Sequence, residues 1–515
     1  MLLILGFLTV VAFIAAWYHL LRKTRYWSNQ GVNQTNPIPL FGDGWEVIFG
    51  KINIADWLQN TYNLYPNARY IGCYNFTAPS LMIRDPDLIK QITVKDFDSF
   101  PNHSEFTDAE SDPLWSKNLF ALKDERWREM RHVMSPTFTS SKIKVIYTLI
   151  SEAAEDFVKY FQNSSSNGAV LELEMKDVFT RFTNDVIASA AFGIKVDSLR
   201  YRDNTFYLEG KKITNFSGFI NIMKFFALQT VPKLCKYLGI KFFSNATRIY
   251  MTNIIEETIK MRQEKNIIRP DIIQTLLDAA KAGNLSEKGT IDGKGKRSVE
   301  ISLEDITSQV VIFFLAGFDS VSTAISFAAY ELAVNKEIQD KLREEIRQTS
   351  QKGKVTYDAL QQMKYLDMVL SEVLRKWPPT PFLDRVCSKP YTIEPINKEE
   401  KSITIAPNTE IWLPVYALHH DSQYYPEPEK FIPERFSEEN KGSINSYVYA
   451  PFGFGPRSCI GNRFALIEVK ALLYNLLLSF EIVPVKKTQI PLVLETGIQT
   501  NAKGGFWLGF KRIES

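Results

Sequence analysis

The chain has few cysteines and almost no net charge. Its four cysteines, in 515 residues, lie far apart and form no C-x-x-C pair, which argues against a disulfide framework and against a structural zinc site. The formal net charge is only +3, so it gives no reason to expect a nucleic-acid partner, and any basic patch must be local. Apolar residues, in contrast, are plentiful: 45% of the chain is hydrophobic and 13% aromatic. Such a chain can bury a large core.

The N-terminal segment is apolar over residues 2–21 and carries no formal charge apart from the titratable His19. Twenty such residues suffice to span a bilayer. Arg22, Lys23 and Arg25 follow at once, and this excess of cations predicts that their end stays in the cytosol. A cleaved signal peptide would instead carry its charges before the apolar run and a small-residue cleavage site after it. We therefore expect an uncleaved membrane anchor.

A proline-containing segment follows the anchor. Pro37 and Pro39 restrict the backbone to an extended path and so predict a stiff connection. We expect three parts: a membrane anchor over 1–21, a basic and proline-rich hinge over 22–42, and a globular domain over 43–515.

The most informative stretch is the turn-rich loop from Pro451 to Gly461. Its glycines, Gly453 and Gly455 among them, let the backbone turn sharply and approach a flat object closely. Cys459 lies just before the start of a helical pattern. There the helix dipole and the unpaired amides favour a thiolate, so the sulfur is poised to ligate a metal.

This loop resembles the F-x-x-G-x-R-x-C-x-G signature of the cytochromes P450. Every fixed position of the signature is met, by Phe452, Gly455, Arg457, Cys459 and Gly461. A buried cysteine in a tight turn is the alternative for an isolated Cys-x-Gly, and the complete string argues against it. The resemblance implies haem b, iron protoporphyrin IX, with Cys459 as the axial thiolate ligand of the iron. It also implies that Phe452, Arg457 and Gly461 contact this cofactor.

Two further segments resemble the parts of this family that hold the haem propionates. Trp127 and Arg131 are four residues apart on a predicted helix and share one face. Alone, such a pair would be interpreted as a surface cation–π contact, whereas the resemblance implies that its indole N–H and guanidinium hold one propionate. Downstream, a rigid Pro-rich run places Arg385 to reach the second propionate, while Thr380 and Phe382 face substrate.

A long helical pattern over 303–331 carries an acid in its apolar middle. Ala316, Gly317 and Asp319 match the [A/G]-G-x-[D/E]-T motif with which this family activates oxygen, and Ser320 stands where threonine is usual. A buried Asp is costly unless something uses it; an acid beside a hydroxyl can relay protons. Serine keeps the hydroxyl but loses the methyl group that limits its rotation. We expect Asp319 and Ser320 to form the catalytic proton relay. The alternative is a helix distorted by glycine, with hydroxyls bonding back to carbonyls.

The resemblance also assigns a pocket and a structural cluster. The substrate pocket would be lined by Leu119, Phe120, Phe313, Phe314, Ala316, Thr380, Phe382 and Thr496. An aromatic section over 216–243 would cap this pocket and dip toward the membrane. Core packing is the ordinary alternative for such aromatics, but the position of the section favours the cap. A Glu-Arg-Arg cluster that locks the core would be formed by Glu372, Arg375 and Arg435.

The implied fold is mainly α with a minor β region: the triangular helical prism of the cytochromes P450 with small β-sheets, preceded by one N-terminal transmembrane helix. Segments such as 192–198, 463–470 and 504–510 are similar to insect microsomal members, family nine in particular.

The implied function is that of a haem-thiolate monooxygenase in the endoplasmic reticulum membrane, with its catalytic domain (43–515) in the cytosol. It would insert one atom of O2 into lipophilic substrates such as plant toxins or insecticides. Its partners would be NADPH-cytochrome P450 reductase, cytochrome b5 as a second candidate electron donor, and the lipid membrane, with no nucleic acid. The basic residues Lys123, Arg126 and Arg128 could dock the reductase or form an ordinary solvated helix face.

Three alternatives remain open. The substrate could be an endogenous lipid, terpenoid or hormone. The same haem loop could serve an enzyme that isomerises peroxides without outside electrons. The chain could also bind haem and a hydrophobic ligand without turnover.

Overall fold

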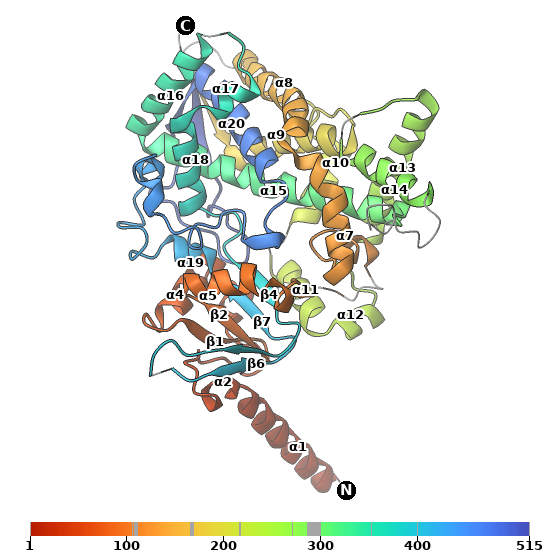
Figure 1. Ribbon diagram of the computed structural model, residues 1–515, viewed down its shortest axis with the longest axis vertical. Coiled ribbons are helices and arrows are strands. Elements are labelled where there is room, and N and C mark those ends of the chain that lie inside the picture. Colours follow the sequence, from red (N-terminus) through yellow and green to blue (C-terminus); the bar gives the residue numbers. More distant parts are fainter. Residues whose placement is uncertain are drawn as a thin grey trace.

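Helices form most of the molecule, and in the part of the chain that the structure describes the named strands lie in three small sheets (Figure 1). The computed structural model describes residues 2–105, 107, 112–164, 169–215, 218–269, 271–285, 300–351, 353–398 and 400–513. In Figure 1 the large helical part lies above the main sheet, and α1 projects from the bottom. The predicted fold class, mainly α with a minor β region, is confirmed.

Helix α1 (Leu2–Lys23) has 22 residues, which at 1.5 Å per residue gives a length of about 33 Å. Most of its described apolar side chains are exposed, among them Phe7 at 68%. Directly after it, α2 (Tyr26–Asn29) buries Trp27 completely, and the indole N–H of Trp27 donates to the carbonyl oxygen of Cys73 (3.1 Å). The chain is therefore fastened to the body as soon as the exposed helix ends.

The main sheet combines strands from the N-terminal part and from the C-terminal third of the chain. Its strand order is β1-β2-β7-β4: β1 (Tyr70–Asn75) and β2 (Ala78–Ile83) form an antiparallel hairpin, β7 (Glu410–Leu413) runs parallel to β2, and β4 (Leu383–Val386) runs antiparallel to β7. Leu81 pairs with Ile411 across it, and both are fully buried. Because β4 pairs with β7, the same sheet fixes the position of Arg385 on β4.

The helical core is organised around α15 (Leu303–Val334). Its N-terminus is held by a capping box between Ser302 and Asp305, an arrangement that satisfies free amides of the first turn. Among the residues whose side chains are described, α15 is the one helix long and apolar enough to cross a membrane, but 67% of its apolar window is buried inside the protein. It is thus a core helix, and it packs along α9 (Met175–Ile187).

Other helices surround this pair. Those nearest the candidate site are α7 (Asp124–Met134), α8 (Ser140–Ser164), α18 (Lys364–Lys376) and α20 (Asn462–Ser479). A group on one side of the body (Figure 1) comprises α10 (Thr205–Thr214), α11 (Phe219–Thr230), α12 (Pro232–Tyr237), α13 (Asn245–Lys265) and α14 (Ile272–Leu285). We call α10–α14 the cap helices.

The remaining α-helices and strands complete the fold. The helices are α3 (Trp45–Ile48), α4 (Ile54–Asn63), α5 (Pro86–Lys90), α6 (Pro113–Ser116), α16 (Lys336–Ser350), α17 (Tyr357–Gln361) and α19 (Val415–His419). Strands β3 (Val170–Glu174), β9 (Trp507–Arg512) and β8 (Phe480–Pro484) form a second sheet, and β5 (Tyr391–Ile393) pairs with β6 (Ile403–Ile405).

Candidate active site

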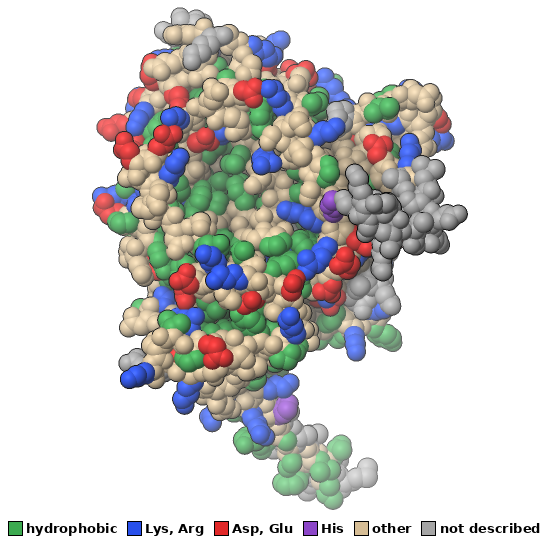
Figure 2. All heavy atoms as spheres, viewed as in Figure 1, with side chains coloured by type: hydrophobic (Ala, Val, Ile, Leu, Met, Phe, Trp, Pro, Cys, Tyr) green, Lys and Arg blue, Asp and Glu red, His purple; other side chains and the backbone are tan. Residues whose placement is uncertain are grey.

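A cavity of about 410 Å³ lies between α15 and the loop before α20, and Figure 2 shows hydrophobic side chains gathered in a hollow in the middle of one face. Most of the residues expected at the site line the cavity: Leu119, Phe120, Trp127, Arg131, Phe313, Ala316, Ser320, Thr380, Arg385, Phe452, Arg457, Cys459 and Gly461. Four expected residues are not among the described residues that line it: Phe314, Asp319, Phe382 and Thr496.

The loop that carries Cys459 is held by its backbone. The N–H of Cys459 donates to the carbonyl oxygen of Phe452 (2.8 Å). Gly455 has a φ of 64°, and a Cβ there would lie 2.1 Å from the carbonyl oxygen of Thr93, so no other residue fits without displacing the chain. Gly461 is the N-cap residue of α20. The loop is therefore specified by backbone geometry as much as by side chains.

The side chain of Cys459 lines the cavity and is exposed to it, although protein surrounds the cavity. Burial raises the pKa of the thiol, while the N–H of Gly461 and the charge of Arg131 act in the opposite direction. The amide at the helix N-terminus and Arg131 thus favour a thiolate, as the sequence indicates, while burial opposes it. A coordinated metal ion deprotonates a thiol outright, so ligation itself would supply the missing stabilisation.

Three guanidinium groups converge on the cavity. Arg131 donates to the carbonyl oxygen of Ser458 (2.9 Å), and Arg385 donates to that of Phe454 (3.2 Å). Burial lowers the pKa of Arg385 to about 10 and that of Arg457 to about 9, and it lowers the pKa of Arg131 too. The buried Nε of Arg385 has no hydrogen-bond partner in the structure. Buried cations at one wall require anionic partners, so this wall is suited to a ligand with carboxylates.

Trp127 has a neighbour that the sequence did not indicate. The guanidinium of Arg457 lies 4.1 Å from the centre of its ring, within the range of a cation–π contact. Arg457 itself donates to several carbonyl oxygens, those of Pro101 and Leu122 at 2.7 Å each. Trp127, Arg131 and Arg457 thus line the same cavity.

The family model of cytochrome P450 matches residues 33–508 of the chain. The chain belongs to the cytochrome P450 family. It is 41% identical to cytochrome P450 9e2 of Blattella germanica, over 98% of this chain and 97% of that protein. It is also 41% identical to probable cytochrome P450 9f2 of Drosophila melanogaster, over 94% of each, and 36% identical to cytochrome P450 6k1 of B. germanica, over 96% and 93% respectively. The predicted resemblance to insect P450s of family nine is confirmed.

Membership makes this P450 a monooxygenase and implies haem with a cysteine thiolate ligand. The cavity fits that group in two ways. A cysteine sulfur is presented at one face, and the desolvated guanidiniums of Arg131, Arg385 and Arg457 suit two propionates.

In this P450 the acid and the alcohol of α15 point in different directions. The Ser320 hydroxyl lines the cavity and donates to the carbonyl oxygen of Ala316 (2.5 Å). Asp319 instead faces α9, where its Oδ1 lies 2.9 Å from the Nζ of Lys176. Consecutive helical residues point about 100° apart. A proton can therefore pass between them only through a bridging group or after the Asp319 side chain has turned toward Ser320.

Lys176 is a residue that sequence reasoning missed. Its ammonium also donates to the Asp319 carbonyl oxygen (2.9 Å), to the Ser322 hydroxyl (2.9 Å) and to the Thr323 hydroxyl. The pairing joins positions 143 residues apart, and no local motif surrounds Lys176. The role of Lys176 therefore becomes visible only in the contact between α9 and α15.

Phe313 and Phe314, which are consecutive on α15, also point in different directions. Phe313 lines the cavity, where its ring lies 5.0 Å from that of Phe138. Phe314 is fully buried against α10, with its ring 5.0 Å from that of Phe206. A Cβ at Gly210 would lie 2.6 Å from the Phe314 ring, so this glycine admits the aromatic side chain. Phe314 therefore joins the cap helices to the core.

The other two expected pocket residues also lie elsewhere. Phe382 stacks on Trp412 with ring centres 5.1 Å apart, because β4 and β7 are neighbours in the main sheet. Thr496 is exposed and lies 3.8 Å from where a Cβ of Gly50 would be.

His103 is a second residue that sequence reasoning missed. It lines the cavity, stacks on Phe120 with ring centres 4.3 Å apart, and its Nδ1 lies 2.8 Å from the Asp384 carboxylate. Burial opposes the ionisation of Asp384, yet His103 and Ser104 hold the pKa of its carboxyl well below its usual range. The only feature of the sequence that could have pointed to this contact is that Asp384 directly precedes Arg385, a residue already expected at the site.

The expected Glu-Arg-Arg cluster comes together behind the cavity. Arg375 donates two hydrogen bonds to Glu372, at 2.8 and 2.9 Å, and both side chains are 0% exposed. Arg435 approaches the same carboxylate at 3.4 Å. His419 extends the cluster: its Nε2 accepts from the N–H of Ala450 (3.0 Å), so its Nδ1–H donates to the Arg375 carbonyl oxygen (3.0 Å). The start of the cysteine loop is thereby tied to this cluster.

Proposed function

We propose that this P450 inserts one oxygen atom of O2 into lipophilic foreign compounds, such as plant toxins or insecticides, with electrons from NADPH. The observation that carries the proposal is the convergence on one cavity of the Cys459 sulfur, three desolvated guanidiniums and an apolar wall. Phe313 and Phe138 contribute aromatic faces to this wall, which favour an apolar substrate.

The haem would be held by residues of three segments. Cys459 would ligate the iron, Arg131, Arg385 and Arg457 would hold the propionates, and Phe452 and Gly461 would contact the ring. When bound, this group supplies the O2 chemistry of the reaction, with its electronics tuned by the axial thiolate.

The protein's own part is to bind, orient and supply protons. Ser320 places a hydroxyl in the cavity, and the Asp319 carboxylate, held by Lys176, lies on the other side of the helix. A proton from the Asp319 side reaches the cavity if Lys176 releases the carboxylate, which can then turn toward Ser320. Residues on α15 would thereby both orient substrate and limit when protons arrive.

The membrane and the electron donors belong to the same proposal. The exposed apolar surface of α1 and the basic residues at its end support insertion in the endoplasmic reticulum membrane, with the body in the cytosol. NADPH-cytochrome P450 reductase would be the electron donor, with cytochrome b5 as a second one. The basic face of α7 is partly neutralised, because Lys123 pairs with Glu105 and Arg128 with Asp98. Docking would have to exchange these pairs for acidic groups of the partner.

The test is the absorption spectrum of the membrane-expressed protein, reduced and exposed to carbon monoxide. Wild type is expected to give the strongly red-shifted Soret band of thiolate-ligated haem, and Cys459→Ala is expected to lack it. Cys235→Ala, which removes a cysteine that does not line the cavity, is the matched control and should keep the band. An imidazole-type spectrum in wild type would contradict the proposal.

Turnover then separates the rival functions. With reductase and NADPH, a monooxygenase forms oxidised product from a lipophilic substrate in proportion to the NADPH consumed. A peroxide isomerase would convert a hydroperoxide without NADPH, and a carrier would give no product at all.

A further inference from the structure

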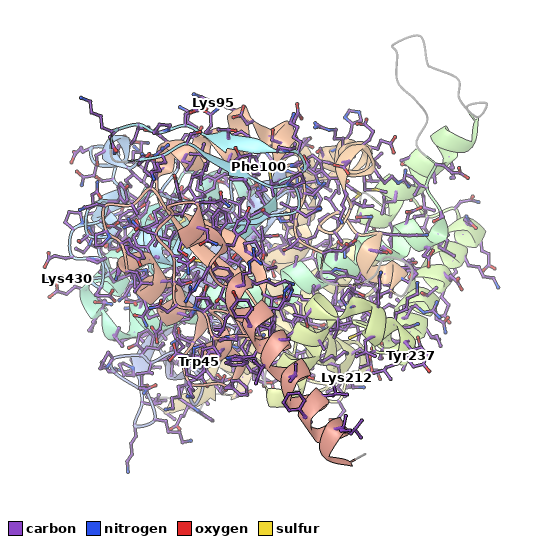
Figure 3. The ribbon with its side chains drawn as sticks, turned by 90° about the horizontal axis from the view of Figure 1, so that it is seen from below. Trp45, Lys95, Phe100, Lys212, Tyr237 and Lys430 are labelled. Atoms are coloured by element: carbon purple, nitrogen blue, oxygen red, sulfur yellow. The ribbon has the colours of Figure 1, made fainter. Side chains whose placement is uncertain are left out.

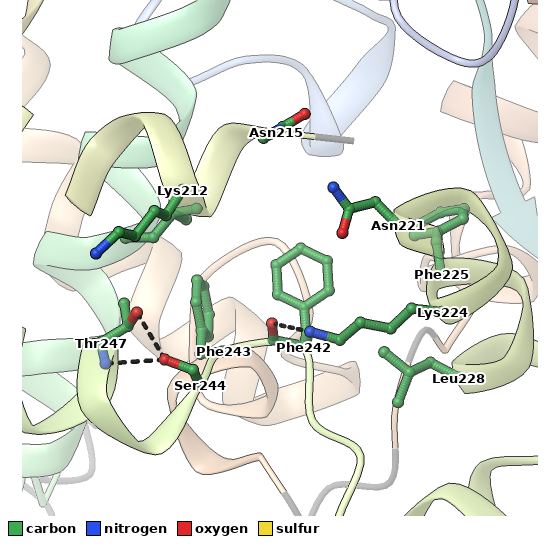
Figure 4. Close-up of a pocket in the computed structure, with 11 residues that line it drawn as sticks. Lys212, Asn215, Asn221, Lys224, Phe225, Leu228, Phe242, Phe243, Ser244 and Thr247 are labelled. Carbon is green, nitrogen blue, oxygen red and sulfur yellow. Dashed lines mark hydrogen bonds between the residues drawn. The ribbon is translucent and has the colours of Figure 1, made fainter. Parts of the chain in front are cut away.

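A second pocket of about 220 Å³ lies among the cap helices, between α10, α11 and the start of α13 (Figure 4). None of its described lining residues lines the active-site cavity. One part of its wall is apolar, with Phe225, Leu228 and Phe243, and another carries the cations Lys212 and Lys224. We call it the cap pocket.

The ammonium of Lys224 is the unusual group in the cap pocket. The side chain extends along the pocket wall to the carbonyl oxygen of Phe242 (3.3 Å; Figure 4). Burial lowers its pKa, and the charge of Asp112 only partly compensates. No carboxylate of the described residues forms an ion pair with Lys224, and Asp112 accepts the N–H of Phe243 (2.8 Å). An ammonium has three donors, so two remain available to a ligand.

The second cation of the cap pocket is differently placed. Lys212 is exposed and pairs with Glu209 (2.6 Å), and Glu209 also accepts from the Thr247 hydroxyl (3.2 Å). This end of the pocket is therefore neutral overall. The net positive charge lies at Lys224, beside the aromatic wall.

Exposed apolar side chains lie next to the cap pocket, beside the exposed lysines Lys233 and Lys236 of α12. On α11 and α12, Ile220 is 81% exposed, Leu234 52% and Tyr237 87%. Figures 1 and 3 both place these helices on the side of the body from which α1 projects. Exposed apolar side chains gathered on one face mark a contact with a membrane or another apolar partner.

A ligand for this arrangement needs an anionic head and an apolar chain. A carboxylate or phosphate would accept from Lys224 in a charge-assisted hydrogen bond, and the first part of the chain would lie on Phe225 and Leu228. The pocket is smaller than the roughly 300–1,000 Å³ of sites that enclose a drug-sized ligand. It would thus hold a head group and the beginning of a chain, while the rest extends over α11 and α12.

We propose that the cap pocket binds the anionic head group of an acyl-chain amphiphile, with Lys224 as its contacting cation. A free fatty acid and an anionic phospholipid share this chemistry. The site is distinct from the active-site cavity, and the proposal holds whether or not the protein is a monooxygenase.

The experiment uses the full chain reconstituted in phosphatidylcholine bilayers that contain a trace of spin-labelled lipid. The measured quantity is the fraction of label immobilised by the protein, for ionised stearate, phosphatidylserine and, as the neutral reference, phosphatidylcholine. Wild type is expected to immobilise stearate, phosphatidylserine or both more strongly than phosphatidylcholine. Lys224→Met is expected to lower this preference about five- to tenfold, the effect of losing one charge-assisted contact.

Matched variants separate this site from general surface charge. Lys233→Met removes an exposed lysine of α12 that does not line the cap pocket and should change nothing, and Lys224→Arg should retain the preference. The carbon monoxide spectrum must stay unchanged in Lys224→Met, which shows that the variant is folded. Preference for stearate alone identifies a fatty acid, and preference for phosphatidylserine alone identifies a phospholipid. No preference in wild type, or an equal preference in Lys224→Met, overturns the proposal.

Discussion

The loop that carries Cys459 lines the active-site cavity, which the cap helices reach only through Ile272 of α14 among the described lining residues, and the two regions are built in opposite ways. The loop is fixed by its own backbone and by buried polar contacts: Gly455 fits only as glycine against Thr93, and the N–H of Ala450 is bound by His419. The cap helices instead expose large apolar side chains such as Ile220 and Tyr237. The loop is therefore fixed by its backbone, whereas the cap helices are attached to the core by side-chain packing such as that of Phe314 on α10.

This difference follows from what each region has to do. A metal ligand and its supporting shell must be held within a fraction of an ångström, and buried hydrogen bonds achieve this because breaking one leaves an unsatisfied group. Substrates of different shape require a wall that can move, and such regions come from the less stable parts of a structure.

The largest effect is expected behind the cysteine loop. Arg375→Ala leaves the carboxylate of Glu372 buried without its bidentate partner, which should cost about 3–5 kcal/mol. We expect little or no thiolate-type carbon monoxide spectrum and a large fall in the thermal midpoint. The exposed pair of Lys364 and Glu438 provides the control, because Lys364→Ala should leave both measurements near wild type. Equal behaviour of the two variants would mean that the buried cluster does not support the loop.

The next largest effect should fall on the attachment of the cap helices. Phe314→Ala removes a fully buried ring that packs on α10, and such truncations cost about 3–5 kcal/mol. We expect faster proteolysis of the cap helices and a lower thermal midpoint. Its neighbour Phe313 faces the cavity, so Phe313→Ala should mainly weaken the substrate-induced shift of the Soret band. If the two variants behave alike, the opposite orientation of these rings is wrong.

A smaller effect is expected at His419, which links the buried cluster to the loop. His419→Asn can replace only the Nδ1 donor and loses the acceptor for Ala450, a loss of about 1–3 kcal/mol. His419→Gln can place an acceptor near Nε2 and should retain more of the thiolate spectrum. The order would be reversed if the contact with Arg375 mattered more than the contact with the loop.

The same histidine gives a pH dependence. Burial, followed by the charge of Arg375, lowers the pKa of His419 to about 3. An unfolded histidine binds its proton near pH 6.5, so the stability that depends on neutral His419 is complete above that pH and is lost as the pH falls toward 3. His419→Gln should therefore lose stability less steeply on acidification than wild type. Some dependence should persist, because burial also lowers the pKa of His420 to about 3.

Sequence reasoning succeeded where the relevant contacts are local. The glycines of the segment from Phe452 to Gly461 predict the turn of this loop, and the motif around Asp319 singles this residue out. The direction of Asp319 does not, because Lys176 on α9 determines it. In the same way, which of Phe313 and Phe314 faces the cavity depends on where α10 packs, and His103 acquires its role through a contact 281 residues away. Long-range packing leaves no periodic signal in the segments that it joins.

The smallest effect is expected from substitutions of Ser320 on α15, the helix between the cysteine loop and the cap helices. Ser320 lines the cavity and its hydroxyl donates back to Ala316, but a serine hydroxyl can also rotate to positions from which it relays no proton. In Ser320→Thr the added methyl group restricts that rotation. We expect the fraction of NADPH electrons recovered in product to rise by about twofold, a difference below 1 kcal/mol. Ser320→Ala lacks the hydroxyl and should lower this fraction, with its carbon monoxide spectrum unchanged. If alanine, serine and threonine give the same fraction, protons enter by another path, and the role of α15 in this P450 would be to shape the cavity.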